Sequence, residues 1–162
     1  MKIIKEIIPY IVIIIAVVFI RSFIITPVMV DGKSMYPTLD NKDIVLLKKI
    51  NKTINRNDIV VLKYKNEKLI KRVIGLPGET IKYESGKLYI NGEKANDAFA
   101  AITDDFDMSS MENNKIPKNY YLVLGDNRNN STDSRKIGFI NIDDIQGTVV
   151  FRLFPLKKIG SI

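Results

Sequence analysis

The chain begins with an apolar stretch that precedes a longer region of short hydrophobic runs. Residues 7–20 carry no charge, and after Arg21 the chain remains apolar from Phe23 to Ile25. A helix over residues 7–25 would rise about 28 Å, close to the ~30 Å hydrocarbon core of a bilayer, if Arg21 extends to the interface. The pattern therefore predicts a transmembrane anchor at residues 7–25.

The charges before this anchor favour a cytoplasmic N-terminus over residues 1–6, because Lys2, Lys5 and the terminal amine precede the apolar run. A cleavable secretory signal has a similarly short apolar region, but no small-x-small cleavage site follows Ile20. We therefore expect an uncleaved anchor in the cell membrane, with residues 26–162 forming an extracytoplasmic domain.

After the anchor, hydrophobic positions follow the period of β-strands rather than of helices. The runs at 43–49 and 58–64 resemble each other, and each follows an Asn/Asp turn. Ser85 and Gly86 separate two alternating runs and predict a hairpin. Strands are expected at 28–30, 43–49, 58–64, 68–75, 80–92 (as a hairpin), 120–127, 137–140 and 147–154. The sequence thus predicts a mostly β, barrel-like domain on one N-terminal transmembrane helix.

Residues 96–118 break the strand periodicity and are rich in Asp, Asn and Ser, which predicts an exposed loop. Its acidic residues lack the spacing and the glycine of an EF-hand, so a solvated loop is preferred over a calcium site. The chain has no Cys and no His, which removes disulfides, thiolate chemistry and the common zinc and haem sites. No metal or other cofactor is expected.

Length and charge limit the partners of the domain. A chain of 162 residues with 46% hydrophobic content fits one compact domain plus an anchor. Its formal net charge is +7, and a basic domain tethered beside a membrane is attracted to anionic lipid. The lysines are scattered and no recognition motif appears, so nucleic acid is not an expected partner.

The missing histidine also limits how a serine could be activated, because the usual imidazole base is absent. Ser34 lies in the run DGKSMYPTL, a stiff and turn-prone setting. Lys71 lies in the apolar run LIKRVIGL, and desolvation lowers the pKa of a lysine, so that its neutral amine can act as a general base. The local patterns leave two alternatives open: Ser34 as an ordinary turn residue, and Lys71 pointing outward by strand alternation.

A third segment, GDNRNNSTDSR at residues 125–135, is dense in hydrogen-bonding side chains. Such a loop can be merely soluble, or it can form a rigid polar network that positions a catalytic amine. Composition does not separate these two interpretations.

Taken together, the segments resemble a type I signal peptidase, the membrane-anchored Ser/Lys protease that removes secretory signal peptides. The resemblance covers nearly the whole chain in order: an anchor, a serine box GKSMYPTL (32–39), a strand box NDIVVLK (57–63), a lysine box KRVIGLPGE (71–79), and the terminal box followed by Gly138. The compact size and single anchor resemble the Gram-positive bacterial type. The endoplasmic reticulum forms have a histidine where this chain has Lys71.

The resemblance implies a role for each matching residue of the site. Ser34 would be the nucleophile and Lys71 the general base, with Ser131 orienting the lysine amine. Some members donate into the oxyanion hole from a side chain two residues before the nucleophile. Here that position is Gly32, so the hole would use backbone donors, chiefly the Ser34 amide. The supporting positions would be Asp133 and Arg135, which brace the terminal loop, and Asp126 and Arg72.

The resemblance also implies a substrate, an extended signal peptide of a preprotein that is added as a strand beside the site. The residues that match the family's pockets for small side chains at −1 and −3 of the cleavage site are Val28, Val30, Met35, Leu39 and Ile70. Each of these is equally what a β core would contain.

Two other functions are compatible with a similar scaffold. Self-cleaving Ser/Lys repressors resemble this family in fold and dyad, but they are cytosolic, and this chain has an N-terminal membrane segment. A non-catalytic pilus-assembly factor would be a degenerate peptidase, whereas Ser34, Lys71, Ser131 and Asp133 are all present here. The sequence therefore favours an active membrane-bound serine endopeptidase.

Overall fold

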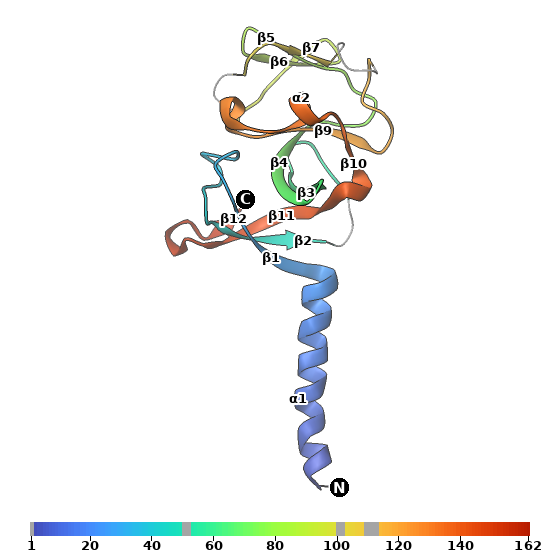
Figure 1. The fold of residues 1–162 in the computed structure, drawn as a ribbon, viewed down its shortest axis with the longest axis vertical. Coiled ribbons are helices and arrows are strands. Elements are labelled where there is room, and N and C mark those ends of the chain that lie inside the picture. The colour runs from blue at the N-terminus through green and yellow to red at the C-terminus, as the bar shows by residue number, and fades with distance from the viewer. Residues whose placement is uncertain (1, 50–52, 100–102, 109–113) are drawn as a thin grey trace.

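A computed structural model describes residues 2–49, 53–99, 103–108 and 114–162 and shows a β-rich domain at the end of one long helix (Figure 1). The N-terminal helix is α1 (Lys2–Phe19), extended by the π-helical turn η1 (Ile20–Ile24). The strands are β1 (Ile25–Met29), β2 (Ile44–Lys48), β3 (Ile59–Tyr64), β4 (Glu67–Gly75), β5 (Ile81–Glu84), β6 (Lys87–Ile90), β7 (Glu93–Ala95), β8 (Phe106–Asp107), β9 (Tyr120–Leu124), β10 (Ile140–Asn141), β11 (Ile145–Phe154) and β12 (Gly160–Ser161). The short helices are η3 (Arg128–Asn130), α2 (Ser134–Ile137), η4 (Ile142–Asp144) and η5 (Leu156–Lys158).

The N-terminal helix projects away from the domain, and none of its apolar window Glu6–Ile24 is buried inside the structure. The mean hydropathy of this window is 2.7, so by length and composition it can cross a membrane. Its end is bonded to the sheet: Thr26 Oγ1 donates to the carbonyl of Arg21 (2.8 Å), and Lys49 Nζ donates to that of Ser22 (3.0 Å). The helix therefore runs directly into β1.

The larger sheet is antiparallel, with the order β1-β2-β11-β3-β4-β9-β10 and β12 added beside β11. These strands confirm most of the runs expected from the sequence, and β2 shows the predicted alternation of burial along its length. The strand expected at 137–140 is wrong for most of its residues, because Ile137 ends α2 and Gly138, with a φ of 81°, caps that helix, so that only Ile140 lies in a strand. The barrel-like expectation is corrected in one respect. The pairing path is open between the end strands β1 and β10, so the described strands do not form a closed barrel.

A smaller sheet of order β7-β6-β5-β8 lies on the far side of the domain from α1 (Figure 1). The predicted hairpin is confirmed: β5 pairs with β6, and Ser85 and Gly86 both have positive φ (51° and 71°), as a tight two-residue turn requires.

The prediction of an exposed loop over 96–118 is wrong for several of its residues. β8 pairs with β5, and Thr103, Met108 and Ile116 are buried. Single apolar residues separated by polar ones gave no recognisable period, although each fills a place in the packed interior. Residues 100–102 and 109–113 of this segment lie outside the described residues.

Three hydrophobic clusters form the core of the described residues. One lies beneath the segment between β1 and β2 and includes Met35 and Leu39, both essentially unexposed. Another joins the two sheets, because Ile74 and Leu124 of the large sheet contact Ile81 and Tyr83 of the small one. The small sheet is therefore packed firmly against the back of β4 and β9.

Candidate active site

Ser34 lies in the segment between β1 and β2, and buried neighbours fix this segment on the core. Met35 follows it directly, and the amide of Leu39 donates to the carbonyl of Met35 (2.9 Å). The terminal loop holds the other side: the amide of Asn127 donates to the carbonyl of Ser34 (3.0 Å), and Asn127 Nδ2 donates to that of Lys33 (3.1 Å). The serine therefore has a fixed backbone, as a nucleophile requires.

Lys71 lies on β4 opposite Val60 of β3, and its side chain points inward. Only 2% of Lys71 is exposed, and Nζ lies 2.7 Å from Ser34 Oγ, with a second hydrogen bond to the carbonyl of Ile70 (2.9 Å). The alternative of an outward-facing lysine is thereby removed. The structure brings together the serine and the lysine that the sequence singled out from segments 37 positions apart.

Burial lowers the pKa of Lys71 from its ordinary 10.5 to about 8, although the charges of Asp133 and Asp126 partly oppose this shift. A low-dielectric site disfavours the ammonium form more than these two carboxylates stabilise it. An appreciable fraction of the amine is therefore neutral near pH 8. In that form it accepts the hydrogen bond, and then the proton, of a serine hydroxyl.

Asp133 and Arg135, the pair to which the family resemblance assigns the bracing of the terminal loop, form an ion pair in it. Asp133 Oδ2 accepts from the Gly125 amide (3.0 Å) and from Arg135 Nη2 (2.9 Å), and Arg135 Nε donates to Asp133 Oδ1 (2.9 Å). Asp133 also caps α2 through the Arg135 amide. Burial alone would raise the pKa of Asp133, but these hydrogen bonds outweigh it and hold the pKa below its usual value. The carboxylate thus stays charged and anchors both ends of the loop.

Ser131 lines the same pocket as Ser34 and Lys71, but it does not bond to the lysine amine. Its hydroxyl helps to lower the pKa of Asp133, yet no atom of the described residues meets hydrogen-bond geometry with its Oγ. The expected orienting bond is therefore not formed here. The carbonyl of Ile70 orients the amine instead, which sequence reasoning missed because backbone acceptors leave no side-chain signal.

Gly125 is a second residue that sequence reasoning did not single out. A Cβ built on it would overlap Ser131 Oγ and would lie 2.5 Å from the carbonyl oxygen of Ser34 and 2.7 Å from Ser131 Cβ. Only a hydrogen fits between these two serines. The sequence signal that could have identified it is the glycine at the start of the terminal box. Its lack of a side chain allows the backbone to approach Ser34 and Ser131 closely.

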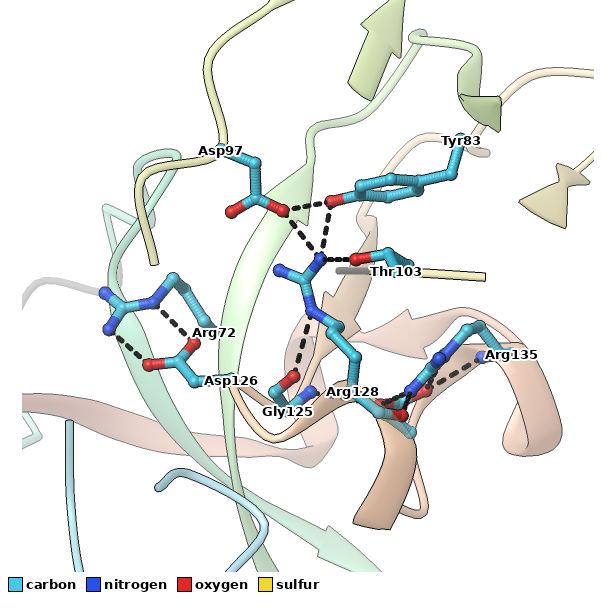
Figure 2. A network of polar contacts seen from close by, with 9 residues as sticks. Arg72, Tyr83, Asp97, Thr103, Gly125, Asp126, Arg128 and Arg135 are labelled. Carbon is cyan, nitrogen blue, oxygen red and sulfur yellow. Dashed lines mark hydrogen bonds and ion pairs between the residues drawn. The ribbon is translucent and has the colours of Figure 1, made fainter. Parts of the chain in front are cut away.

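Arg72 and Asp126 form a buried bidentate ion pair behind the site (Figure 2). Arg72 Nε donates to Oδ1 (2.9 Å) and Nη2 to Oδ2 (2.7 Å), and Thr38 Oγ1 donates to the same carboxylate (2.5 Å). This cluster therefore joins Thr38 of the serine box, Arg72 of the lysine box and Asp126 of the terminal box. The predicted supporting role of Arg72 and Asp126 fits this placement.

Gly32 adopts a positive φ of 90°, which favours glycine, but its amide donates to Asn41 Oδ1 (3.0 Å). Gly32 therefore shapes the turn before Ser34 and does not supply a second free donor. The amide of Ser34 is then the candidate oxyanion donor that the family resemblance implies.

A cavity of about 440 Å³ lies beside the serine and is bordered by Val28 of β1 and Ile70 of β4. It shares Asp31 and Leu69 with the cavity of about 390 Å³ that contains Ser34 and Lys71. The other three residues expected to line substrate pockets are placed in the core instead, because their side chains pack into the cluster beneath the serine segment. They are Val30, Met35 and Leu39.

Comparison with known proteins gives concordant results. A family model described as signal peptidase, peptidase S26, matches residues 3–154. The signal peptidase I of Bacillus caldolyticus is 36% identical over 93% of this chain and 91% of that protein. Signal peptidase I S of Bacillus subtilis is 39% identical over 90% and 88%. The crystal structure of a signal peptidase I from Enterococcus faecalis has a TM-score of 0.57 and 34% identity, and covers 60% of this chain and 97% of that one.

Proposed function

The chain belongs to the signal peptidase family S26, a family of serine peptidases, and we propose that it cleaves signal peptides from preproteins. We propose further that it does so with a Ser34/Lys71 dyad on the extracytoplasmic face of the cell membrane. The single observation that carries the dyad is the 2.7 Å contact between Lys71 Nζ and Ser34 Oγ, made by a lysine that burial makes less basic.

In the proposed reaction, neutral Lys71 takes the proton of Ser34 as the hydroxyl oxygen attacks the carbonyl carbon of the residue at −1. The Ser34 amide donates to the oxyanion of the tetrahedral intermediate. The Lys71 ammonium then protonates the leaving amine, which becomes the N-terminus of the mature protein. Water attacks the ester left on Ser34 as Lys71 accepts a proton from it, and Lys71 returns that proton to Ser34 Oγ as the signal peptide leaves with a new carboxylate.

Two strand edges support binding of an extended peptide. β1 is the end strand of the large sheet, and residues 67–71 of β4 lie beyond the part of β4 that pairs with β9. Val28 and Ile70 border the cavity between them. A signal peptide added there as a strand would place the carbonyl at −1 beside Ser34, with its small side chains facing the cavity that Val28 and Ile70 border.

Membrane anchoring is proposed for the exposed apolar helix Glu6–Ile24. None of that window is buried in the protein, so a bilayer is the environment that would cover it. Its continuity with β1 supports an uncleaved anchor, because removal of the helix would take away the carbonyls that Thr26 and Lys49 bond. Lys2 and Lys5, which precede this apolar window in the chain, support a cytoplasmic N-terminus.

The proposed function is tested by incubating the purified full chain in detergent with a signal-bearing preprotein and mapping the new N-terminus by mass spectrometry. One cut after a small residue at −1, with another small residue at −3, is expected. The Ser34→Ala variant is the matched control. An intact preprotein after prolonged incubation with the folded wild-type chain would reject the peptidase proposal and favour a non-catalytic assembly role.

The pH dependence of cleavage follows from the lowered pKa of Lys71. Only the neutral amine accepts the Ser34 proton, so kcat/KM should rise with pH through about 8 and level off above it. Initial rates between pH 6 and pH 10 (roughly two units either side of this pKa) measure the midpoint, and melting curves at each pH exclude unfolding. A rate that falls as pH rises through 8 contradicts a lysine base.

The orientation in the membrane can be tested because the chain has no cysteine of its own. In intact cells a membrane-impermeant maleimide should label Lys157→Cys, at an exposed position of the domain, and should leave Lys2→Cys unlabelled until the cells are lysed. The reverse pattern would place the domain in the cytoplasm.

A further inference from the structure

Arg128, a buried residue of the terminal loop, joins that loop to the small sheet (Figure 2). Its Nε donates to the carbonyl of Gly125 (3.0 Å), on the side of the active site. On the other side Nη1 donates to the hydroxyls of Tyr83 (3.0 Å) and Thr103 (2.5 Å) and lies 2.6 Å from Asp97 Oδ2. One guanidinium therefore bridges the two parts of the domain.

All the partners on the far side come from the small sheet and the segment after it. Tyr83 is on β5, whereas Asp97 and Thr103 follow β7, and the Tyr83 hydroxyl also donates to Asp97 (2.5 Å). The side chain of Arg128 is 1% exposed, and a guanidinium removed from water needs a counter-charge. Asp97 supplies that charge. The Nη2 of Arg128 has no hydrogen-bond partner among the described residues, so its position rests on the bonds of Nε and Nη1. The position of Arg128 thus depends on the small sheet.

The same segment makes a second contact with the catalytic side. The ring of Phe99 lies over the guanidinium of Arg72, 3.7 Å from ring centroid to Cζ. Arg72 is the partner of Asp126, the residue next to Gly125. Side chains that follow β7 therefore contact both arginines behind the dyad, one from the lysine box and one from the terminal box.

On the side of the active site, Arg128 contacts the backbone of Gly125. The carbonyl of Gly125 accepts from Arg128, and its amide donates to Asp133. Its Cα fits closely between Ser131 and the backbone of Ser34. The carbonyl of Arg128 itself accepts from Arg135 Nη2 (2.6 Å), so the arginine is tied to the brace of the loop as well.

Building on the proposed function, we propose that Arg128 is a positioning residue: held by Asp97, Tyr83 and Thr103, it fixes the Gly125 peptide and thereby the packing of Ser34 and Ser131 around the Lys71 amine. The small sheet is then part of the catalytic scaffold, although it contributes no group to the reaction. A planar fork suits this role, because one side chain reaches a carbonyl and a carboxylate in opposite directions.

The test is Arg128→Lys in the full chain, which keeps the charge and loses the fork. Cleavage kinetics should show kcat lowered about tenfold with KM unchanged, since the residue borders neither cavity beside Ser34. The midpoint of the pH–rate curve should move upward, because a looser loop admits water to Lys71.

The matched control is Arg56→Lys, which alters an ion pair with Glu79 and a bond to the carbonyl of Ile74, outside the site. It should lower the melting temperature and leave kcat and the midpoint unchanged.

A milder variant, Tyr83→Phe, removes one hydroxyl and keeps the ring in its core cluster, so it serves if Arg128→Lys fails to fold. A smaller fall in kcat with the same upward movement of the midpoint is expected. Wild-type values of kcat and midpoint in a folded Arg128→Lys or Tyr83→Phe chain overturn the positioning role while the peptidase function stands. Absence of cleavage by the wild-type chain rejects both proposals.

Discussion

Replacing Lys71 with alanine is expected to reduce preprotein cleavage to background, a fall of at least about 10³-fold in kcat. The chain has no histidine, and Lys71 Nζ is the amine hydrogen-bonded to Ser34 Oγ. Without it the serine hydroxyl has no positioned base to take its proton. Single-turnover cleavage with excess enzyme measures the chemical step directly.

The variant Lys71→Met serves as the control for folding, because it keeps most of the side-chain volume without the charge. At pH 7 the wild-type lysine is protonated in a site that lowers its pKa from 10.5 to about 8, so its charge destabilises the fold by up to about 3 kcal/mol. Loss of the bonds to Ser34 and Ile70 offsets part of that gain. Lys71→Met should therefore melt no lower than the wild type at pH 7.

The sign of the pH effect gives a further check on the same variant. Between about pH 8 and 10.5 the unfolded chain binds more protons at Lys71 than the folded chain, so the wild-type protein gains stability as pH rises through this window. Lys71→Met lacks this gain, and the two melting curves should converge or cross there. Cleavage by folded Lys71→Met would contradict the dyad mechanism.

Much of the fold could be predicted from the sequence, because hydrophobic runs of strand length are bounded by turn residues that mark their ends. The runs around Val45, Val61 and Val123 all became strands of the large sheet. That the end strands β1 and β10 do not pair could not be predicted, since the pairing of end strands depends on the folded arrangement rather than on any local pattern. The prediction of an exposed loop over residues 96–118 failed for a related reason. The buried side chains of this segment are isolated in the sequence and have apolar neighbours only in the folded chain.

The residues of the site also differ in whether the sequence could predict them. Ser34 and Lys71 could be singled out because the chain has no histidine, Ser34 lies in a stiff turn-prone run, and Lys71 lies in an apolar run. The structure places the two side chains in contact. Strand alternation alone could not decide the direction of Lys71, because that depends on the loop that covers the strand. The bond from Lys71 to a backbone carbonyl and the bridge made by Arg128 had no sequence signal, since both partners were distant or lacked a side chain.

Replacing Gly125 with alanine should lower kcat by about 10² or more, although the added group is one methyl. The methyl would overlap Ser131 Oγ and come within 2.5 Å of the Ser34 carbonyl oxygen, and the second of these is backbone that cannot rotate away. The Gly125 amide is held by Asp133 and its carbonyl by Arg128, so the loop cannot retreat without breaking these bonds. Relief must come from the serine segment, which moves Ser34 Oγ away from Lys71.

Gly75→Ala provides the matched control for this steric effect. A Cβ at Gly75 would also overlap neighbours, but these are the side chains of Ile116, Ile81 and Leu122 in the cluster between the two sheets. Overpacking there costs about 1–3 kcal/mol of stability. Gly75→Ala should therefore lower the melting temperature and keep kcat, whereas Gly125→Ala should lose kcat even at temperatures where it is fully folded. Equal loss of stability with unchanged kcat in both variants would mean that the serine segment tolerates the displacement.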